Sequence, residues 1–213
     1  VHVRVRPLSE SEQSRGGSAW RLQGRTLTPL DSSSGGYSLD QVYDEGCSNE
    51  QVYAGTAQSL VREVARGFHA TVFAYGQTSS GKTHTMMGTA EDPGLVPRAV
   101  RELFSLIAQA RRREFLLRAS YMEIYNEEII DLLAPGEAGA RLGVQESREG
   151  GGAQVVGLRE ELVTCPEDVL GLLARGEGAR HVGETRMNAR SSRSHAIFRM
   201  VVESRARQGE GRG

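Results

Sequence analysis

The chain has 213 residues, of which 38% are hydrophobic and 25% are charged, and its formal net charge is -1. This length supports one large domain with a sizeable core, and the charge does not indicate a disordered tail. The near-neutral charge does not indicate a nucleic-acid binder, and no apolar run has the length that spans a membrane. We therefore expect one globular, intracellular domain without nucleic-acid or membrane partners.

The cysteines and the two ends of the chain add further expectations. Cys47 and Cys165 lie far apart and form no metal-binding spacing, which is typical of ordinary thiols in a reducing compartment. No signal peptide precedes Val1, and the chain starts directly in a strand pattern without an initiator Met. It stops in the polar stretch 208–213, so we expect a fragment of a longer protein.

The first elements are predicted to be short strands. Valines alternate with polar residues over Val1–Arg6, which predicts a half-buried strand that ends at Pro7. The Ser- and Gly-rich region 8–37 predicts loops and small hairpins around Trp20–Leu22 and Thr26–Thr28. A further strand is expected over Tyr37–Tyr43.

A capping box, Ser48–Gln51, then predicts the start of a helix that Gly67 ends. One face of this helix would carry the apolar residues Tyr53, Ala57, Leu60 and Val64.

The most informative stretch fits the pattern G-x-x-x-x-G-K-[ST] at every fixed position. It consists of Gly76, Gln77, Thr78, Ser79, Ser80, Gly81, Lys82 and Thr83. The apolar run Ala70–Tyr75 before it predicts a buried strand, and Lys82–Met87 after it can start a helix. In this context glycines let backbone N–H groups surround phosphate oxygens, Lys82 reaches the β/γ-phosphates, and Thr83 can ligate Mg²⁺.

The lysine content supports this interpretation. Only one of the 26 basic residues is a lysine, and that residue is Lys82. A compact ammonium fits among phosphate oxygens where a planar guanidinium would fit poorly. The alternative, a Gly- and Ser-rich turn without a ligand, stays open at this point.

The middle of the chain alternates helix and strand patterns. After a turn over Gly88–Gly94, apolar residues at helical spacing predict a helix that starts near Pro97 and ends near the basic triplet 111–113. A strand follows over Phe115–Tyr121, then a short helix or continued turn over Glu127–Leu133. The glycines at 150–152 predict a hairpin tip between strands 142–145 and 153–156, and another strand is expected over 158–163.

The last part contains a second capping box. Thr164–Glu167 predicts the start of a helix that Gly176 ends, followed by an irregular polar stretch, 178–193, and a final strand, Ala196–Val202. Strands that alternate with helices around a phosphate loop predict an α/β sandwich.

A second nucleotide-sensing element lies in the polar stretch, in the octet Asn188–His195. Its hydroxyls, amide and arginines could meet a γ-phosphate, its Mg²⁺ and the attacking water. From the residues alone, it could equally be a solvated or phosphorylatable loop.

This octet resembles the N-x-x-S-S-R-S-H switch I of kinesin motors, and Gly76–Met86 resembles their phosphate loop. Arg4–Pro7 is similar to the kinesin R-x-R-P strand, and Tyr121–Glu127 is similar to the Y-x-E-I-Y-N-E strand. The resemblance covers essentially the whole chain. The phrases 113–118 and 183–188 look closest to the centromere-associated mitotic class.

The resemblance implies the fold of a P-loop NTPase of the kinesin type, with a mainly β central sheet between helices on both faces. It implies roles for switch I as well, with Ser192 beside Thr83 at Mg²⁺ and with Asn188 and Ser191 near the γ-phosphate and the lytic water. Arg4, Pro7 and His84 would flank the adenine.

The resemblance also implies what the chain lacks. The switch I arginine of kinesins, here Arg193, pairs with an acidic residue of switch II. The sequence D-x-x-G at Asp168–Gly171 falls inside a predicted helix, and Asp131 is a poor Walker B candidate. We therefore expect residues 1–213 to be the nucleotide-binding part of a motor domain cut before switch II, one that folds poorly and hydrolyses ATP slowly when isolated.

The implied function is an ATP-driven microtubule motor of the cytoplasm and cytoskeleton, with a role at the mitotic spindle and kinetochore and a homodimeric full-length form. Within this chain, the implied microtubule contact is the hairpin near Arg148, although an ordinary solvated hairpin would look the same.

Two alternatives stay open. A GTPase or small-molecule kinase would share the phosphate loop, but the chain has no N-K-x-D motif. A non-motile microtubule or cargo adaptor derived from a kinesin would share the whole resemblance.

Overall fold

The structure is a computed structural model that describes residues 1–31, 35–134, 142–146, 153–184 and 194–207. The chain divides into two compact units, which are described separately below. Unit 1 comprises Val1–Glu63 and Ala70–Ala99, and unit 2 comprises Val64–His69 and Val100–Gly213. Within the described residues, no helix is long and apolar enough to cross a membrane.

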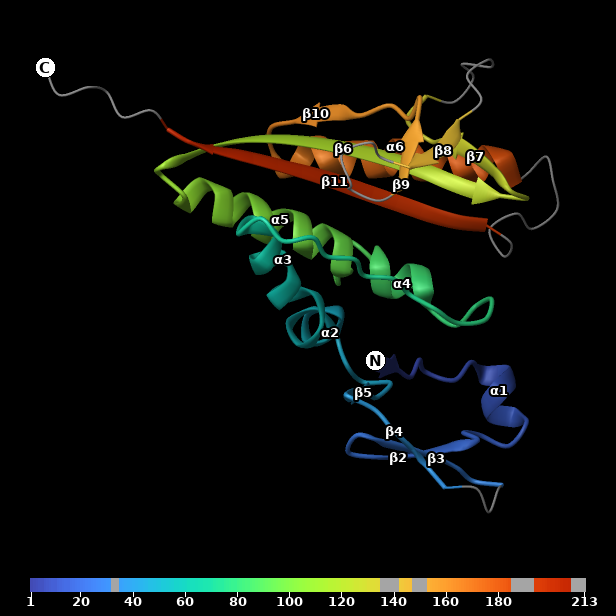
Figure 1. The fold of residues 1–213 in the computed structure, drawn as a ribbon. Helices are drawn as coiled ribbons and strands as arrows, with labels where there is room; N and C mark the ends of the chain where they lie inside the picture. Colours follow the sequence, from blue (N-terminus) through green and yellow to red (C-terminus); the bar gives the residue numbers. More distant parts are fainter. Residues whose placement is uncertain (32–34, 135–141, 147–152, 185–193, 208–213) are drawn as a thin grey trace, which may run out of the picture. The chain divides into compact units, whose positions relative to one another are not determined.

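Unit 1 begins with short strands, as predicted. The strand β1 (His2–Arg4) pairs in parallel with β5 (Gln41–Tyr43). The strands β2 (Trp20–Gln23), β3 (Thr26–Pro29) and β4 (Tyr37–Ser38) form an antiparallel sheet, which confirms the predicted hairpins (Figure 1). The helix α1 (Glu10–Ser14) lies between β1 and β2 in the chain. The predicted strand over Tyr37–Tyr43 is therefore two strands in two different sheets.

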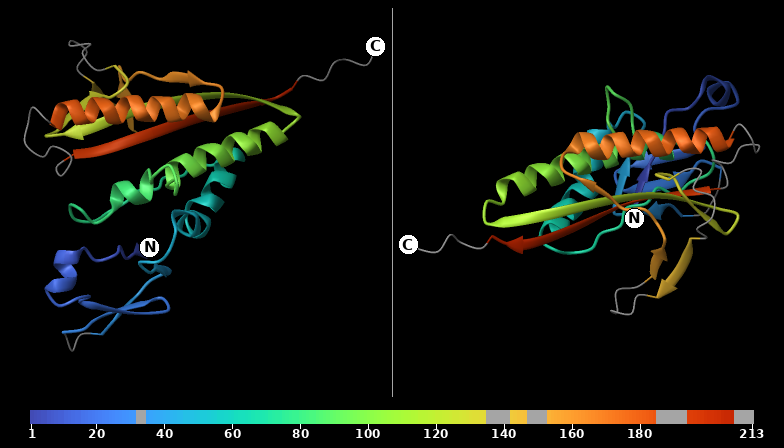
Figure 2. Two further views of the ribbon diagram at one scale, coloured as in Figure 1. Left: turned by 180° about the vertical axis from the view of Figure 1, so that it is seen from behind. Right: turned by 90° about the horizontal axis from the view of Figure 1, so that it is seen from above.

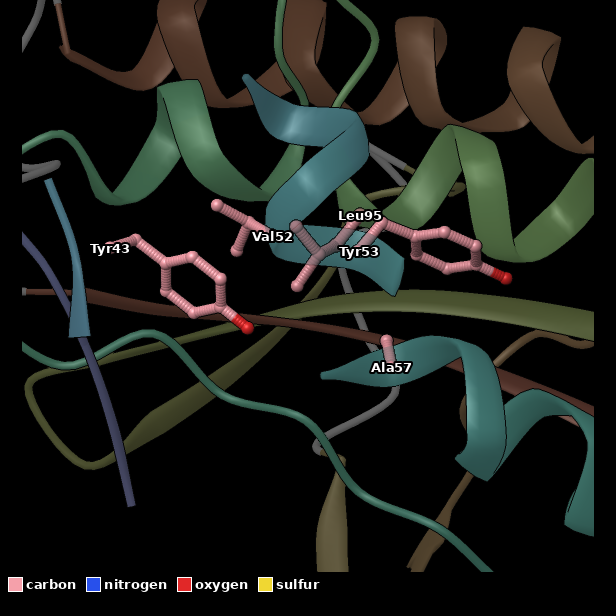
Figure 3. Close-up of a cluster of buried hydrophobic side chains, with 5 residues drawn as sticks. All are labelled: Tyr43, Val52, Tyr53, Ala57 and Leu95. Atoms are coloured by element: carbon pink, nitrogen blue, oxygen red, sulfur yellow. The ribbon is translucent and has the colours of Figure 1, made fainter. Parts of the chain in front are cut away.

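Two helices follow where the sequence predicted one. The helix α2 (Asn49–Gly55) starts at the predicted capping box, in which Ser48 and Gln51 bond each other's backbone N–H groups. The helix α3 (Ala57–Ala65) starts anew after a break at Thr56. Figure 3 shows the buried cluster that holds this part of unit 1 together, formed by Tyr43, Val52, Tyr53, Ala57 and Leu95.

The predicted buried strand Ala70–Tyr75 is wrong as a local assignment. The segment has no regular secondary structure, and no strand among the described residues pairs with it. Phe73 is 81% exposed and Tyr75 is 95% exposed. A strand needs a neighbour to bond its N–H and C=O groups, so an apolar, β-branched composition alone does not produce one.

The phosphate-loop motif leads into α4 (Lys82–Met86), as predicted. The turn after it is closed by an isolated bridge between Gly88 and Pro93. The helix α5 (Leu95–Gln109) then begins at the predicted place. Within unit 2, its residues Val100 and Leu103 are buried, in agreement with the predicted apolar face.

The centre of unit 2 is a pair of long antiparallel strands, β6 (Arg113–Tyr125) and β11 (Ser194–Ala206), shown in Figures 1 and 2. The strands β7 (Glu128–Asp131) and β10 (Glu161–Val163) also pair with β6. The predicted helix or turn over Glu127–Leu133 is therefore wrong. Asn126 and Glu127 both have positive φ, 49° and 61°, which suits a tight hairpin turn between β6 and β7.

The predicted hairpin strands are confirmed as β8 (Gly143–Glu146) and β9 (Ala153–Val156), whereas the tip with Arg148 lies outside the described residues. The helix α6 (Pro166–Glu184) starts at the second predicted cap and runs alongside β6 (Figure 1). It does not end at Gly176, and its last turn replaces part of the predicted irregular stretch. Gly176 lies within the helix and faces Tyr121, where a side chain would collide with the ring, so glycine at this position is explained by packing and not by a helix end.

Candidate phosphate-binding site

The phosphate-loop residues form a compact turn at the start of α4. Ser79 and Gly81 have positive φ, 64° and 91°, and Gly81 is the N-cap residue of α4. The backbone N–H of Ser80 donates to Gln77 O at 3.2 Å. A Cβ added at Gly76 would lie 2.5 Å from Ser80 Oγ and 3.2 Å from Ser80 Cβ, so a side chain here would have to displace Ser80. The loop therefore folds back on itself, as phosphate loops do.

Lys82 turns its side chain back over the loop. Its Nζ donates to Gly76 O and to Gln77 O, both at 2.8 Å. An ammonium is a compact charge with three donors, and carbonyl oxygens at this distance show that it lies at the concave side of the turn. Phosphate oxygens are stronger acceptors than these carbonyls because they are charged. Lys82 can therefore exchange these two carbonyl partners for the oxygens of a bound anion.

The end of β1 lies beside this loop. A Cβ added at Gly81 would lie 3.9 Å from Arg6 Cβ. The Arg6 guanidinium binds Glu12 with both ends, at 2.8 Å and 2.5 Å, and also donates to Pro7 O at 2.9 Å. These bonds lower the pKa of Glu12 to about 2, with Arg6 as the largest cause and the capping Ser9 next. This pair fixes the R-x-R-P turn next to the phosphate loop.

Arg4 and His84 take different positions. The Arg4 guanidinium donates to Thr85 Oγ1 and to Cys47 O, both at 3.0 Å, and to Asn49 Oδ1. The His84 side chain is exposed, and its backbone carbonyl accepts from Asn49 Nδ2 at 3.2 Å. Pro7 is exposed as well. Their roles around an adenine remain predictions.

The sequence missed a polar cluster next to α4, built on buried Asn49 and on partly buried Asp92 and Arg98. Asn49 follows a capping serine and looks like an ordinary first residue of a helix. Asp92 and Arg98 lie on either side of a predicted helix start. No local pattern in the sequence relates these three positions, which only the fold brings together.

Four predicted catalytic residues, Asn188, Ser191, Ser192 and Arg193, lie outside the described residues. The two aspartates that the sequence set aside have structural partners. Asp168 accepts from the N–H of Thr164 at 2.8 Å and from that of Cys165 at 3.2 Å, and thus caps α6. Asp131 accepts from the N–H of Leu133 and of Arg159, both at 2.8 Å. Both carboxylates therefore accept hydrogen bonds from backbone N–H groups, Asp131 in loops and Asp168 at the start of a helix.

The geometry fits a phosphate group. A narrow turn in which Gly76 lies against Ser80, a glycine N-cap at Gly81 and a lysine bound to loop carbonyls together supply close backbone approach and positive charge. Thr83, the second residue of α4, is exposed, so its hydroxyl is open to a metal ion that accompanies the phosphates.

Comparison with known proteins shows the family of the chain. Residues 4–212 match the family described as "Kinesin motor domain". The chain is 49% identical to the kinesin-like protein KIN-7I of Oryza sativa subsp. japonica over 99% of the chain, and 49% identical to KIN-7O of Arabidopsis thaliana over 100% of it. It spans only 17% and 16% of the length of these two relatives.

A solved structure agrees as well. The chain superimposes with a TM-score of 0.88 and 37% identity on a structure described as that of a fast kinesin, over 96% of this chain and 59% of the other. The predicted kinesin-type fold is thereby confirmed. The KIN-7 names of the relatives do not support the centromere-associated mitotic class that phrases 113–118 and 183–188 predicted, and that prediction is corrected.

Proposed function

Because the chain belongs to the kinesin motor domain family, we propose that it forms the nucleotide-binding part of an ATP-driven microtubule motor. The observation that carries this proposal is Lys82, whose Nζ lies 2.8 Å from two loop carbonyls at the first residue of α4. The reaction is phosphoryl transfer from ATP to water, in which positioning and charge stabilisation supply the catalysis.

On binding ATP, Lys82 would release Gly76 O and Gln77 O and donate to β- and γ-phosphate oxygens. The backbone of Gly76–Thr83 would surround the same phosphates, since Gly76 and Gly81 leave room for close approach. Mg²⁺, when bound, supplies positive charge that neutralises the phosphate oxygens. Thr83 and Ser192 are the residues that we propose to hold it.

The remaining roles rest on the kinesin resemblance. Asn188 and Ser191 would position the lytic water and contact the γ-phosphate. Arg193 would pair with an acidic residue of switch II. Arg4, Pro7 and His84 would border the adenine, and the closeness of Arg6 to Gly81 supports this arrangement because it places the R-x-R-P turn at the loop.

The partner in this proposal is the microtubule. The fast kinesin of similar structure is described as interacting with microtubules. For the full-length form of this chain we propose the same partner, a homodimer joined by a coiled coil, and work on spindle microtubules in dividing cells. Fluorescence imaging of the tagged full-length protein tests the last point, since exclusion from the spindle would contradict it.

The test of function is steady-state ATP hydrolysis by the full-length protein, with and without microtubules. We expect stimulation by microtubules and a loss of at least about 100-fold in Lys82→Ala, because positioning and charge stabilisation of the phosphates carry the catalysis. A preference for GTP over ATP would favour a GTPase instead. Microtubule binding that is unaffected by ATP, without turnover, would favour a non-motile adaptor.

A further inference from the structure

Asn49 is fully buried and uses both ends of its side chain. The residue is 0% exposed at the first position of α2. Its Nδ2 donates to His84 O at 3.2 Å and to Asp92 O at 2.9 Å, while its Oδ1 accepts from the Arg4 guanidinium. An amide buried with both donors and its acceptor bonded is held in one orientation. Asn49 therefore joins α2 to α4 and to the turn after α4.

A second link to α4 runs through Arg4. The same Arg4 nitrogen that donates to Asn49 also donates to Thr85 Oγ1 at 3.0 Å. The other terminal nitrogen donates to Cys47 O at 3.0 Å, just before α2. The strand β1 is thus bonded to α4 and to the start of α2 through one guanidinium.

Asp92 holds the opposite side of the cluster. Its Oδ2 accepts from the backbone N–H of Asn49 at 2.9 Å, and its Oδ1 accepts from Arg98 at 3.2 Å. The pKa of Asp92 is lowered, with the N–H of Asn49 as the largest cause. Arg98 in turn donates from Nε to Pro93 O at 2.8 Å. The turn after α4 is therefore tied to α2 and to α5.

The bonds from Asn49 to His84 O and from Arg4 to Thr85 Oγ1 both end on the five-residue helix α4. So short a helix has little stability of its own, because nucleation costs more than a few internal hydrogen bonds return. Its first two residues are Lys82 and Thr83, the side chains assigned to phosphate and Mg²⁺. Its orientation must then come from outside contacts, and Asn49 and Arg4 supply polar ones of defined direction at His84 and Thr85.

We propose that Asn49 is a positioning residue of the phosphate site, which it orients through α4 without touching nucleotide, and that Arg4 supports the same helix in addition to its proposed place beside the adenine. The proposal rests on the proposed function, because it assumes that Lys82 and Thr83 bind ATP and Mg²⁺. A residue that only stabilised the fold would change how much protein is folded, whereas a positioning residue changes the affinity of each folded site.

The test measures Mg·ADP binding to the full-length protein with a fluorescent ADP analogue, in titrations that give both Kd and the number of sites. Asn49→Ala and Asn49→Asp should each raise Kd about 10-fold per folded site, since both lose the donors to His84 O and Asp92 O. Asn49→Asp keeps the acceptor for Arg4 but sets a charged oxygen against His84 O and Asp92 O, so its effect should be at least as large as that of Asn49→Ala. Thr85→Val, which keeps the shape of the side chain, should raise Kd about threefold.

The matched control is Gln51→Ala. Gln51 lies in the same first turn and completes the capping box of α2 with Ser48, but no bond joins it to α4 among those the structure describes. It should lower the thermal midpoint while leaving Kd within about twofold of wild type. If Asn49→Ala fails to fold, Thr85→Val decides alone.

Wild-type Kd in both Asn49 variants, or in Thr85→Val, would overturn the proposal while leaving the proposed function intact. Failure of the proposed function looks different. In that case wild-type protein would bind no Mg·ADP, or Lys82→Ala would bind it as well as wild type does.

Discussion

The contact between α6 and β6 provides a sharp test of how unit 2 is packed. Gly176 is buried where α6 passes β6, and a Cβ added there would overlap Tyr121 Cδ1, lie 2.8 Å from Tyr121 Cε1 and lie 3.4 Å from Leu132 Cβ. The ring cannot move aside easily. It is 4% exposed, it packs edge-on against Phe198 with ring centroids 5.9 Å apart, and its hydroxyl donates to Glu177.

The magnitude for Gly176→Ala follows from two opposing effects. Alanine is favoured over glycine inside a helix by about 0.5–1 kcal/mol. Forcing an extra methyl group into a packed core costs about 1–3 kcal/mol. We therefore expect a net loss of up to about 2.5 kcal/mol in the free energy of unfolding of unit 2.

Gly171 and Gly178 provide matched controls in the same helix. Both are exposed, and an added Cβ at either would meet nothing within 4 Å. Gly171→Ala and Gly178→Ala should stabilise by about 0.5–1 kcal/mol. Because helix propensity is common to all three variants, the difference between Gly176→Ala and the controls isolates the contact with Tyr121.

Native-state hydrogen exchange of α6 and β6 amides in the full-length protein measures this difference locally, with the thermal midpoint as a second readout. Exchange in Gly176→Ala should be faster than in the controls by a factor that corresponds to about 1–3 kcal/mol. If the α6 and β6 amides exchange as slowly in Gly176→Ala as in Gly171→Ala, then α6 does not pack against Tyr121 as described.

Three further predictions concern other groups. Lys82→Arg should reduce ATP affinity by about 10-fold or more in a binding titration, because a planar fork replaces a compact charge; unchanged affinity would show that only the charge matters. Burial, followed by the bond to Glu177, raises the pKa of Tyr121, so the folded state favours the neutral phenol. Stability should then fall as pH rises above about 10, and Tyr121→Phe should reduce this alkaline loss in thermal unfolding scans, with the remainder due in part to Tyr43, whose pKa burial also raises. Leu173→Ala should destabilise by about 2–5 kcal/mol in hydrogen exchange, since this side chain is buried, whereas exposed Leu162→Ala should change stability by less than about 1 kcal/mol.

Local chemistry explains what was predicted correctly. The Ser48 capping box starts α2, and the glycine-rich loop precedes α4, because each is specified by residues within a few positions of one another. The hairpin β8–β9 followed from a glycine tip between strand patterns. The kinesin motifs likewise identified the family, since each is a contiguous stretch.

The errors have two causes, a missing distant partner and a turn whose residues did not signal it. Ala70–Tyr75 has the composition of a strand but no paired neighbour among the described residues. Asn126 and Glu127 adopt left-handed backbone angles, which glycine adopts most readily. Because neither residue is glycine, the sequence did not indicate this turn, and β7 was missed.

The sequence by itself determined the chemistry of this protein, namely a phosphate loop with its single lysine, and the family to which that loop belongs. Only the tertiary structure decided how the loop is supported. The bonds of the supporting cluster join residues up to 81 positions apart, so no local pattern could relate them. They connect Arg4, Asn49, Thr85 and Asp92. A sequence motif contains the residues that contact a ligand. The residues that hold the loop in place are identified by burial and hydrogen bonding, which exist only once distant segments are packed together.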